Sequence, residues 1–148
     1  MRVVIVDDEK DMRLSITQWL TLSGYETESY SCAKDALAQI GSDYPGIVVT
    51  DIKMPGIDGL QLLKRIMALD TTLPVILITG HGDVPMAVEA MRLGAFNFLE
   101  KPFNPEALTQ LVKLAIQNRR SSLSNRDLRS ELSDGSKIIK KLAGTSKF

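Results

Sequence analysis

The chain has 148 residues, enough for one domain with a buried core and a short appendage. It is 44% hydrophobic and 24% charged, as soluble globular proteins usually are, and no apolar run approaches the roughly 18 residues of a membrane span. We therefore expect no membrane association. The first segment turns acidic at Asp7, which predicts no signal peptide, and Cys32 as the only cysteine excludes an intramolecular disulfide, so we expect a cytoplasmic protein.

The net charge of zero is unevenly divided along the chain. Residues 1–103 carry 9 Lys/Arg and 14 Asp/Glu, a charge of −5, whereas residues 104–148 carry 9 Lys/Arg and 4 Asp/Glu, a charge of +5. An acidic body with a basic tail does not indicate a surface that binds nucleic acid throughout. A solvated basic linker is enough to explain the tail.

Five segments predict β-strands. Val3–Val6, Ile47–Val49 and Val75–Ile78 are continuous apolar runs, typical of strands that are buried on both faces. Tyr25–Tyr30 and Phe96–Leu99 alternate between apolar and polar residues, which is typical of strands with one wet face. We therefore expect the first three strands in the interior of a sheet and the last two at its edges.

A helical spacing of apolar residues follows each strand. Gly24, Gly41 and Gly94 end the first, second and fourth of these segments, the third runs from about Asp58 to Leu69, and Asp83 is a suitable N-cap for the fourth. Strands that alternate with helices indicate βαβ units and a parallel sheet. With right-handed crossovers, the pattern allows a doubly wound, flavodoxin-like α/β fold of five parallel strands in the order 2-1-3-4-5.

The last predicted helix is longer than the sheet it would cover. It opens at Asn104-Pro105-Glu106 and continues to about Leu132, which is about 28 residues or roughly 40 Å from Pro105. We expect an extended C-terminal helix that protrudes from the domain. Leucines along it could form a seam with a partner helix, but Ser121, Ser122 and Ser124 interrupt the heptad, and a frayed linker is the alternative.

Polar residues follow four of the predicted strands at their carboxyl ends, namely Asp7 and Asp8, Asp51, Thr79, and Lys101. In the expected strand order these ends meet at one rim of the sheet. Neighbouring carboxylates repel one another, and Mg²⁺ is the usual remedy. An Asp carboxylate can attack phosphorus, and a Lys ammonium and a hydroxyl can then neutralise the phosphoryl oxygens. Each residue alone has a mundane explanation, such as a helix cap or strand propensity, but the set points to phosphoryl chemistry at Asp51.

The motifs around these residues together resemble the receiver domain of two-component response regulators. The resemblance covers roughly residues 1–120 and rests on four motifs of this chain, which are Val6-Asp7-Asp8-Glu9, Thr50-Asp51-Ile52-Lys53-Met54-Pro55-Gly56-Ile57-Asp58-Gly59, Thr79-Gly80 and Lys101-Pro102-Phe103. It implies a regulatory domain rather than an enzyme, although such a domain assists its own phosphorylation and dephosphorylation.

The resemblance also implies roles for individual residues. Asp51 would accept a phosphoryl group from a sensor histidine kinase. Mg²⁺ would be bound directly by Asp8, Asp51 and the backbone carbonyl of Lys53, with Asp7 acting mainly through water. Thr79 and Lys101 would hold the phosphoryl oxygens, Thr79 and Phe98 would form a switch, and the Lys101–Pro102 peptide bond would be cis. A plain core aromatic remains the alternative for Phe98.

Residues 78–91 and 98–103 resemble, more narrowly, regulators of the NtrC group, particularly those of four-carbon dicarboxylate transport. The long helical linker runs into Leu142-Ala143-Gly144-Thr145-Ser146-Lys147, which is similar to the entry of the AAA+ ATPase that activates sigma-54 RNA polymerase. This likeness implies a receiver at 1–120 and, at 121–148, a helical linker and the start of that downstream domain. A homodimer would then be rearranged by phosphorylation, and DNA would be bound only by an output domain beyond this chain. Similar loops occur in nitrogen-fixation regulators with a helix-turn-helix output. We expect His81 to be a surface loop residue.

Two other classes of protein fit the residues less well. A hydrolase that turns over an aspartyl phosphate on small substrates would need an acid two residues after Asp51, where this chain has Lys53. A flavin-binding module would need a glycine- and hydroxyl-rich phosphate loop after the first strand, where this chain has three acids that repel a phosphate.

Overall fold

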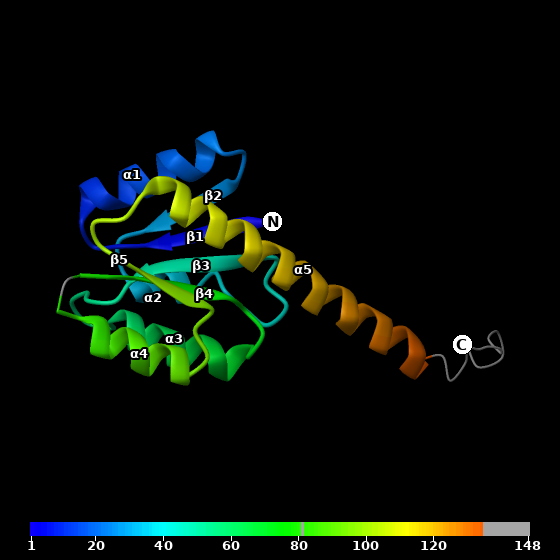
Figure 1. Cartoon of the computed structure of the whole chain (residues 1–148). Helices are drawn as coiled ribbons and strands as arrows, with labels where there is room; N and C mark the ends of the chain where they lie inside the picture. The colour runs from blue at the N-terminus through cyan, green and yellow to red at the C-terminus, as the bar shows by residue number, and fades with distance from the viewer. Residues whose placement is uncertain (81, 135–148) are drawn as a thin grey trace.

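The computed structural model describes residues 1–80 and 82–134, with side chains of the last helix as far as Asp127. Five strands alternate with five helices along this part of the chain (Figure 1). The elements are β1 (Arg2–Val6), α1 (Lys10–Leu22), β2 (Glu26–Tyr30), α2 (Ala33–Leu37), β3 (Gly46–Asp51), α3 (Gly59–Leu69), β4 (Val75–Thr79), α4 (Val84–Arg92), β5 (Asn97–Glu100) and α5 (Pro105–Asp134).

All five strands are parallel and lie in the order β2-β1-β3-β4-β5. The predicted flavodoxin-like order is therefore confirmed, as is the placing of the two alternating strands at the edges. Every residue of β3 and β4 is buried, whereas β2 and β5 keep exposed positions. The unbroken apolar runs are buried on both sides because helices cover both faces of the sheet.

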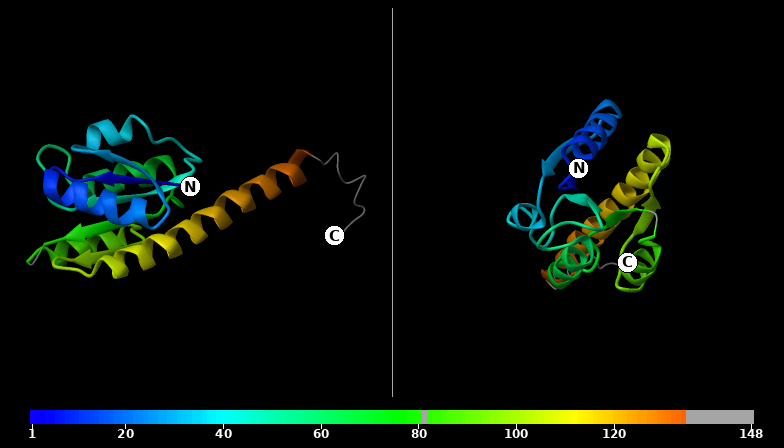
Figure 2. Two further views of the ribbon diagram at one scale, coloured as in Figure 1. Left: turned by 90° about the horizontal axis from the view of Figure 1, so that it is seen from above. Right: turned by 90° about the vertical axis from the view of Figure 1, so that its left-hand side faces the viewer.

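Two hydrophobic cores lie on opposite faces of this sheet. Helices α2, α3 and α4 cover one face, and α1 and α5 cover the other (Figures 1 and 2). Along β1, for example, Val4 and Val6 face the first core and Val3 and Ile5 the second. This alternation is the two-residue period of a strand, and it places apolar side chains on both faces of the interior strands.

Several element boundaries differ from the prediction by a residue or more, and the second helix differs most. The second helix, expected to run close to Gly41, ends at Leu37, although Ile40 beyond it is still buried with 6% of its surface exposed. A non-helical turn is enough to return Ile40 to the core, so the apolar spacing does not require the helix to continue. Strand β5 covers Asn97–Glu100 rather than Phe96–Leu99.

Polar side chains begin two of the helices. The Asp58 carboxylate accepts a hydrogen bond from the Gln61 N–H at 2.8 Å, and the Gln61 side chain accepts one from the Asp58 N–H at 3.1 Å. This capping box satisfies donors that the first turn of α3 leaves free. At the start of α5, the Asn104 side chain accepts from the Glu106 N–H at 2.8 Å, which confirms the predicted opening of that helix.

Helix α5 has 30 residues and a length of about 45 Å at 1.5 Å per residue. Its first half packs on the sheet through Leu108, Val112, Ala115 and Ile116, and its C-terminal part extends beyond the body of the domain (Figure 1). The predicted protruding helix is therefore confirmed through Asp134. The side chains of the predicted leucine seam beyond Asp127, His81, and residues 135–148 lie outside the described residues.

Within the described residues, no helix is long and apolar enough to cross a membrane.

Gly59 allows the first turn of α3 to pass close to the end of β3. A Cβ atom at this position would lie 2.3 Å from the Asp51 carbonyl oxygen and 2.7 Å from the Ile52 Cα. We expect Gly59→Ala to lower the free energy of unfolding by about 1–3 kcal/mol, because backbone atoms must move to accept the methyl group. Chemical denaturation measures this change.

Gly41→Ala is the matched control for Gly59→Ala. A Cβ atom at Gly41 meets nothing within 4 Å. Its expected effect is between zero and a gain of about 1 kcal/mol, since alanine restricts the unfolded chain more than glycine does. Equal effects of the two substitutions would contradict the close approach as the reason for glycine at position 59.

Candidate functional site

The predicted rim lies at the carboxyl ends of the strands. Asp7 and Asp8 follow β1, Asp51 and Thr79 are the last residues of β3 and β4, and Lys101 follows β5. The order of the strands places β3 at the centre of the sheet, between β1 and β4, so Asp51 has a functional side chain on either side. Parallel strands deliver all of these side chains to one end of the sheet.

Three carboxylates form the centre of the site. Asp7, Asp8 and Asp51 each offer an oxygen, and these oxygens all lie within 4.8 Å of one another. Asp7 and Asp51 are buried, with 1% and 8% of their surfaces exposed, whereas Asp8 is exposed. Carboxylates this close repel one another and raise the local affinity for a hard cation with oxygen ligands.

The carboxyl group of Asp7 is buried, and this changes its pKa. Burial, together with the nearby charge of Asp51, raises the pKa of Asp7 to about 6, although a hydrogen bond from the Glu9 N–H at 2.9 Å opposes the shift. Its Oδ2 atom is buried and has no hydrogen-bond partner among the described residues. A buried acceptor without a partner is costly, and a hydrated cation would satisfy it. The donor set therefore fits Mg²⁺.

Asp51 is paired with Lys101. The Lys101 Nζ lies 3.5 Å from the Asp51 Oδ2, and 27% of the lysine side chain is exposed. Burial raises the pKa of Asp51 from its ordinary value, while the ammonium of Lys101 and the N–H groups of Ile52 and Lys53 act in the opposite direction. The carboxylate thus has a positive charge and two backbone donors beside it.

Thr79 and Phe98 lie on adjacent strands, β4 and β5. The Thr79 hydroxyl is buried and donates to the Gly80 carbonyl at 3.3 Å. Phe98 pairs with Leu77 in the register of the two strands and packs, partly buried, against the core formed with α2, α3 and α4. The structure thus brings Asp7, Asp8, Asp51 and Lys101 into one cluster, with Thr79 at the end of the neighbouring strand and Phe98 beside that strand.

Two interactions at the rim were not predicted. The Lys53 ammonium lies 3.0 Å from the Asp83 carboxylate, so the loop after β3 is tied to the start of α4. Asp83 occupies the N-cap position as expected, but its side chain makes no capping hydrogen bond. In addition, the Arg13 guanidinium donates to the Asp7 carbonyl at 2.7 Å. Both join residues of different elements, which sequence spacing alone does not reveal.

The loop after β5 packs against α1. The Lys101–Pro102 peptide bond is cis, as expected. The Phe103 ring meets Trp19 edge to face, with ring centroids 5.9 Å apart and planes at 84°. A pocket beside this contact is lined by Met12, Trp19, Lys101, Pro102 and Phe103. Lys101, which pairs with Asp51, therefore lines the same pocket as Met12 and Trp19 of α1.

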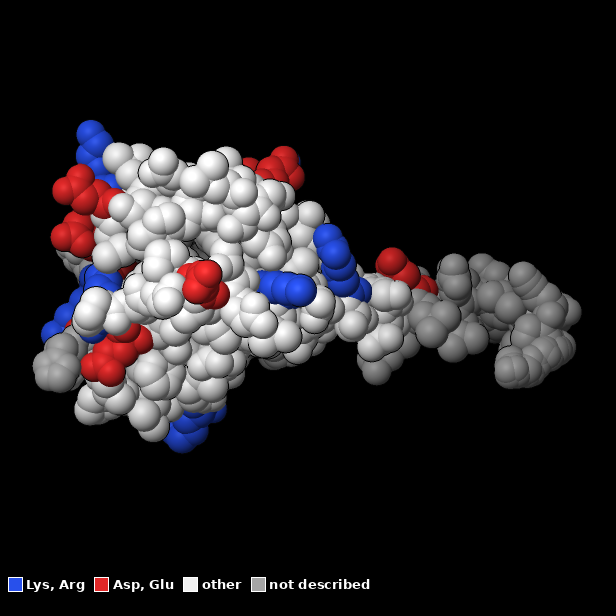
Figure 3. Space-filling view, turned by 45° about the horizontal axis from the view of Figure 1, so that its top comes forward, with Lys and Arg blue, Asp and Glu red and all other residues white. Residues whose placement is uncertain are grey.

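Acidic side chains gather at the end of the domain farthest from the protruding part of α5, with lysine and arginine side chains beside them (Figure 3). This agrees with the uneven charge of the sequence, in which residues 1–103 carry 14 Asp/Glu and 9 Lys/Arg.

A family model of the response regulator receiver domain matches residues 3–113 of the chain. The chain belongs to this family and forms a regulatory domain of a two-component response regulator.

Among relatives within the family, a regulator of C4-dicarboxylate transport agrees with the narrower resemblance. The C4-dicarboxylate transport transcriptional regulatory protein DctD of Rhizobium meliloti (strain 1021) is 47% identical over 127 residues, which are 86% of this chain and 28% of that protein. The transcriptional regulatory protein FixJ of Bradyrhizobium diazoefficiens is 43% identical over 115 residues, which are 78% of this chain and 56% of that protein. The chain spans less than two-thirds of either relative.

Solved structures share the fold. The structure of NtrX from Brucella abortus in complex with ADP matches with a TM-score of 0.77 and 34% identity, over 96% of this chain and 34% of that chain.

The raised pKa of Asp7 predicts a pH-dependent stability. Because the folded protein holds the Asp7 proton up to about pH 6, the stability that protonation contributes is complete below about pH 4 and is lost as the pH rises through 6. In the absence of divalent cations at pH 8, we expect Asp7→Asn to raise the free energy of unfolding by about 1–3 kcal/mol. Denaturation at pH 8 and pH 4.5 measures this gain, which should shrink at the lower pH.

Asp8→Asn serves as the control, because it removes the same charge from an exposed position. The free energy of unfolding at pH 8 should rise less in Asp8→Asn than in Asp7→Asn. A gain from Asp7→Asn that is the same at both pH values would argue against burial of the charge as its cause.

Proposed function

We propose that this domain accepts a phosphoryl group on Asp51 from a sensor histidine kinase, in a reaction that depends on Mg²⁺. The observation that carries the proposal is the cluster itself, in which Asp51 lies close to two further carboxylates and pairs with the ammonium of Lys101, 3.5 Å away. Membership of the receiver family supports the same chemistry.

Asp8, Asp51 and the backbone carbonyl of Lys53 would hold the metal, with Asp7 acting mainly through bound water. The partnerless Oδ2 of Asp7 and the close approach of the carboxylate oxygens support this assignment. When bound, Mg²⁺ supplies positive charge that offsets the carboxylates and the phosphoryl oxygens.

In the proposed transfer, an Asp51 carboxylate oxygen attacks the phosphorus of the kinase phosphohistidine. The phosphorus–nitrogen bond breaks, its electron pair leaves with the imidazole, and an acyl phosphate forms on Asp51. Lys101 is positioned to stabilise charge on the phosphoryl oxygens, since it already contacts Asp51. The Thr79 hydroxyl, which donates to the Gly80 carbonyl at 3.3 Å, would donate instead to a phosphoryl oxygen.

Movement of the Thr79 side chain would link the phosphorylation site to the surface formed by α4, β5 and α5. Phosphorylation adds about −1.5 to −2 charge and three acceptor oxygens. A Thr79 side chain drawn toward them leaves space that Phe98, on the adjacent strand, enters. Helix α4, strand β5 and helix α5 would then present a different surface.

The output we propose is control of a downstream sigma-54-dependent AAA+ ATPase through rearrangement of a homodimer in the cytoplasm. Residues 1–120 would form the receiver, and residues 121–148 the helical linker and the start of the downstream domain, with DNA bound only by a further output domain. Similarity to DctD supports this. Similarity to FixJ keeps open the second candidate, a receiver with a helix-turn-helix output.

Phosphorylation can be tested with a small phosphodonor such as acetyl phosphate. Wild-type protein with Mg²⁺ should gain one phosphoryl group by intact mass spectrometry, and Asp51→Asn should gain none. Lys101→Ala should slow the reaction by about a hundredfold, as expected for loss of one charge-stabilising donor. Asp11→Asn and Lys64→Ala, which change exposed residues, are the matched controls. Phosphorylation of Asp51→Asn at the wild-type rate would overturn the assignment of the acceptor.

The switch can be tested by light scattering and small-angle X-ray scattering with Mg²⁺ and beryllofluoride, a phosphoryl mimic. Wild type should change its molar mass or shape, and Phe98→Ala should lose this response while still binding the mimic. Phe96→Ala is the control, because Phe96 packs on the opposite face of the sheet. A wild-type response in Phe98→Ala would remove Phe98 from the mechanism.

A further inference from the structure

A second polar cluster lies at the opposite end of the sheet, where the loops before β3 and β4 meet the far part of α5. Its centre is Asp70, whose side chain is 2% exposed, and Arg119, whose side chain is fully buried. Buried charges at this depth need partners. The cluster has no part in the phosphoryl chemistry proposed above.

Arg119 donates hydrogen bonds to three partners, one from each nitrogen of its guanidinium group. Its Nη2 contacts the Asp70 Oδ2 at 2.9 Å, its Nη1 donates to the Thr72 hydroxyl at 2.9 Å, and its Nε donates to the Tyr44 carbonyl at 3.0 Å. These partners come from the loops on either side of β3 and α3. Arg119 therefore joins α5 to two loops at once, without contact with solvent.

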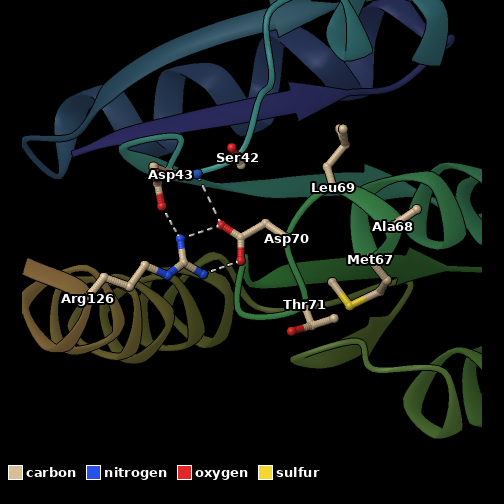
Figure 4. A pocket seen from close by; sticks show the side chains of 8 residues that line it. All are labelled: Ser42, Asp43, Met67, Ala68, Leu69, Asp70, Thr71 and Arg126. Atoms are coloured by element: carbon tan, nitrogen blue, oxygen red, sulfur yellow. Dashed lines mark hydrogen bonds and ion pairs between the residues drawn. The ribbon is translucent and has the colours of Figure 1, made fainter. Parts of the chain in front are cut away.

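Arg126 lies two turns further along α5 and binds the same carboxylate from the outside. Its guanidinium contacts the Asp70 Oδ2 at 2.9 Å, the Asp70 Oδ1 and the Thr72 hydroxyl, and it also forms an ion pair with Asp43. Figure 4 shows the side chain reaching from α5 toward both acids, beside an open pocket. Arg126 and Asp43 are 34% and 66% exposed, in contrast to Arg119.

The backbone of Asp43 provides independent support for this arrangement. Its φ is +62°, and it is the only described non-glycine residue with a positive φ. Its N–H donates to the Asp70 Oδ2 at 3.2 Å, while its carboxylate pairs with Arg126. Such a conformation carries strain and persists where the surroundings hold it. Asp70 thus organises both the loop of Asp43 and the helix of Arg126.

The charges of the cluster balance, with two guanidinium groups against two carboxylates. Hydrogen bonds from Arg126 first, and also from Thr72 and Arg119, hold the pKa of Asp70 well below its usual range despite its burial. Asp70 consequently remains ionised and forms ion pairs with both arginines.

We propose that this cluster is a two-part lock that sets the direction in which α5 leaves the domain. Arg119 is the fixed, buried base, and Arg126 is the outer latch, which is open to solvent and can be released. Residues 120–134 make up 15 residues of helix beyond the base, a length that is only marginally stable in water on its own. The latch keeps this segment helical and aligned with the body of the domain.

The two parts differ in how easily they break. Opening the contacts of Arg119 leaves a buried charge without a partner, which is strongly unfavourable. Arg126 and Asp43 can exchange their contacts for water, and salt screens exposed pairs. The lock therefore permits a change in the direction of α5 without unfolding the receiver. It goes beyond the proposed phosphotransfer and does not depend on it.

Hydrogen exchange of the whole chain tests the latch. Arg126→Gln should make amides of residues 120–134 exchange about tenfold faster, since local opening becomes easier, while β3 and β4 keep their protection. Arg120→Gln removes the same charge from an exposed position of the same helix and is the matched control. Unchanged exchange in Arg126→Gln, or an equal change in Arg120→Gln, would overturn the proposal.

Distances between spin labels test the direction of the helix. In a Cys32→Ser background, labels at K64C on α3 and S124C on α5 should give one narrow distance distribution, and Arg126→Gln should broaden or shift it. Asp43→Asn, which keeps a residue tolerant of positive φ but removes the carboxylate, should act in the same direction. A distribution unchanged by both substitutions would refute the latch.

Both experiments are repeated with Asp51→Asn. The effect of Arg126→Gln should persist there, because the lock lies at the other end of the sheet. Failure of the latch and failure of Asp51 as phosphoryl acceptor are then distinguished, since phosphorylation assays report only the second. An effect of Arg126→Gln that disappears in Asp51→Asn would contradict a lock that acts independently.

Discussion

Burial of the parallel sheet on both faces is the constraint on which the rest of this domain depends. The interior strands carry apolar side chains toward both helical layers, so polar chemistry is confined to the two ends of the strands. The carboxyl ends hold Asp51 and its neighbours, and the amino ends hold Asp70 and the two arginines. Helix α5 runs from one end to the other and is the physical connection between them.

The two polar clusters follow opposite electrostatic principles. At the carboxyl ends, three carboxylates lie close together, the ammonium of Lys101 pairs with Asp51, and burial raises the pKa of Asp7 and Asp51. At the amino ends, Asp70 is matched by guanidinium groups that lower its pKa. The first cluster has more negative than positive charges, which suits it to binding a cation. In the second cluster the charges are paired, which suits it to holding elements of the fold together.

Much of this organisation could be predicted from the sequence, because it depends on short periodic patterns. Apolar runs identified the interior strands, alternation identified Tyr25–Tyr30 and Phe96–Leu99 as edges, and residues next to strand ends identified the acidic rim. Motif resemblance then led to the receiver family. The second helix was predicted too long, because Ile40 marks a buried position without showing the backbone conformation that delivers it.

The lock and the Lys53–Asp83 pair could not be predicted in the same way. Arg119 and Arg126 reach Asp70 across 49 and 56 residues, and Asp43 lies 83 residues from Arg126. Arg119 lies seven residues after Val112 and four after Ala115, on the buried face of the helix, but this spacing does not show which distant residues pair with it. Arg120, adjacent to Arg119, is exposed, so the packed orientation of α5 decides which of the two enters the core.

The contact between Trp19 and Phe103 has a practical consequence. Trp19 is the only tryptophan of the chain, and its indole lies against the ring two residues after Lys101, in a pocket that Lys101 itself helps to line. Intrinsic tryptophan fluorescence of the unlabelled protein therefore comes from a single indole at the edge of the acidic rim. Its emission offers a direct optical signal of events around Lys101, in real time and without any dye.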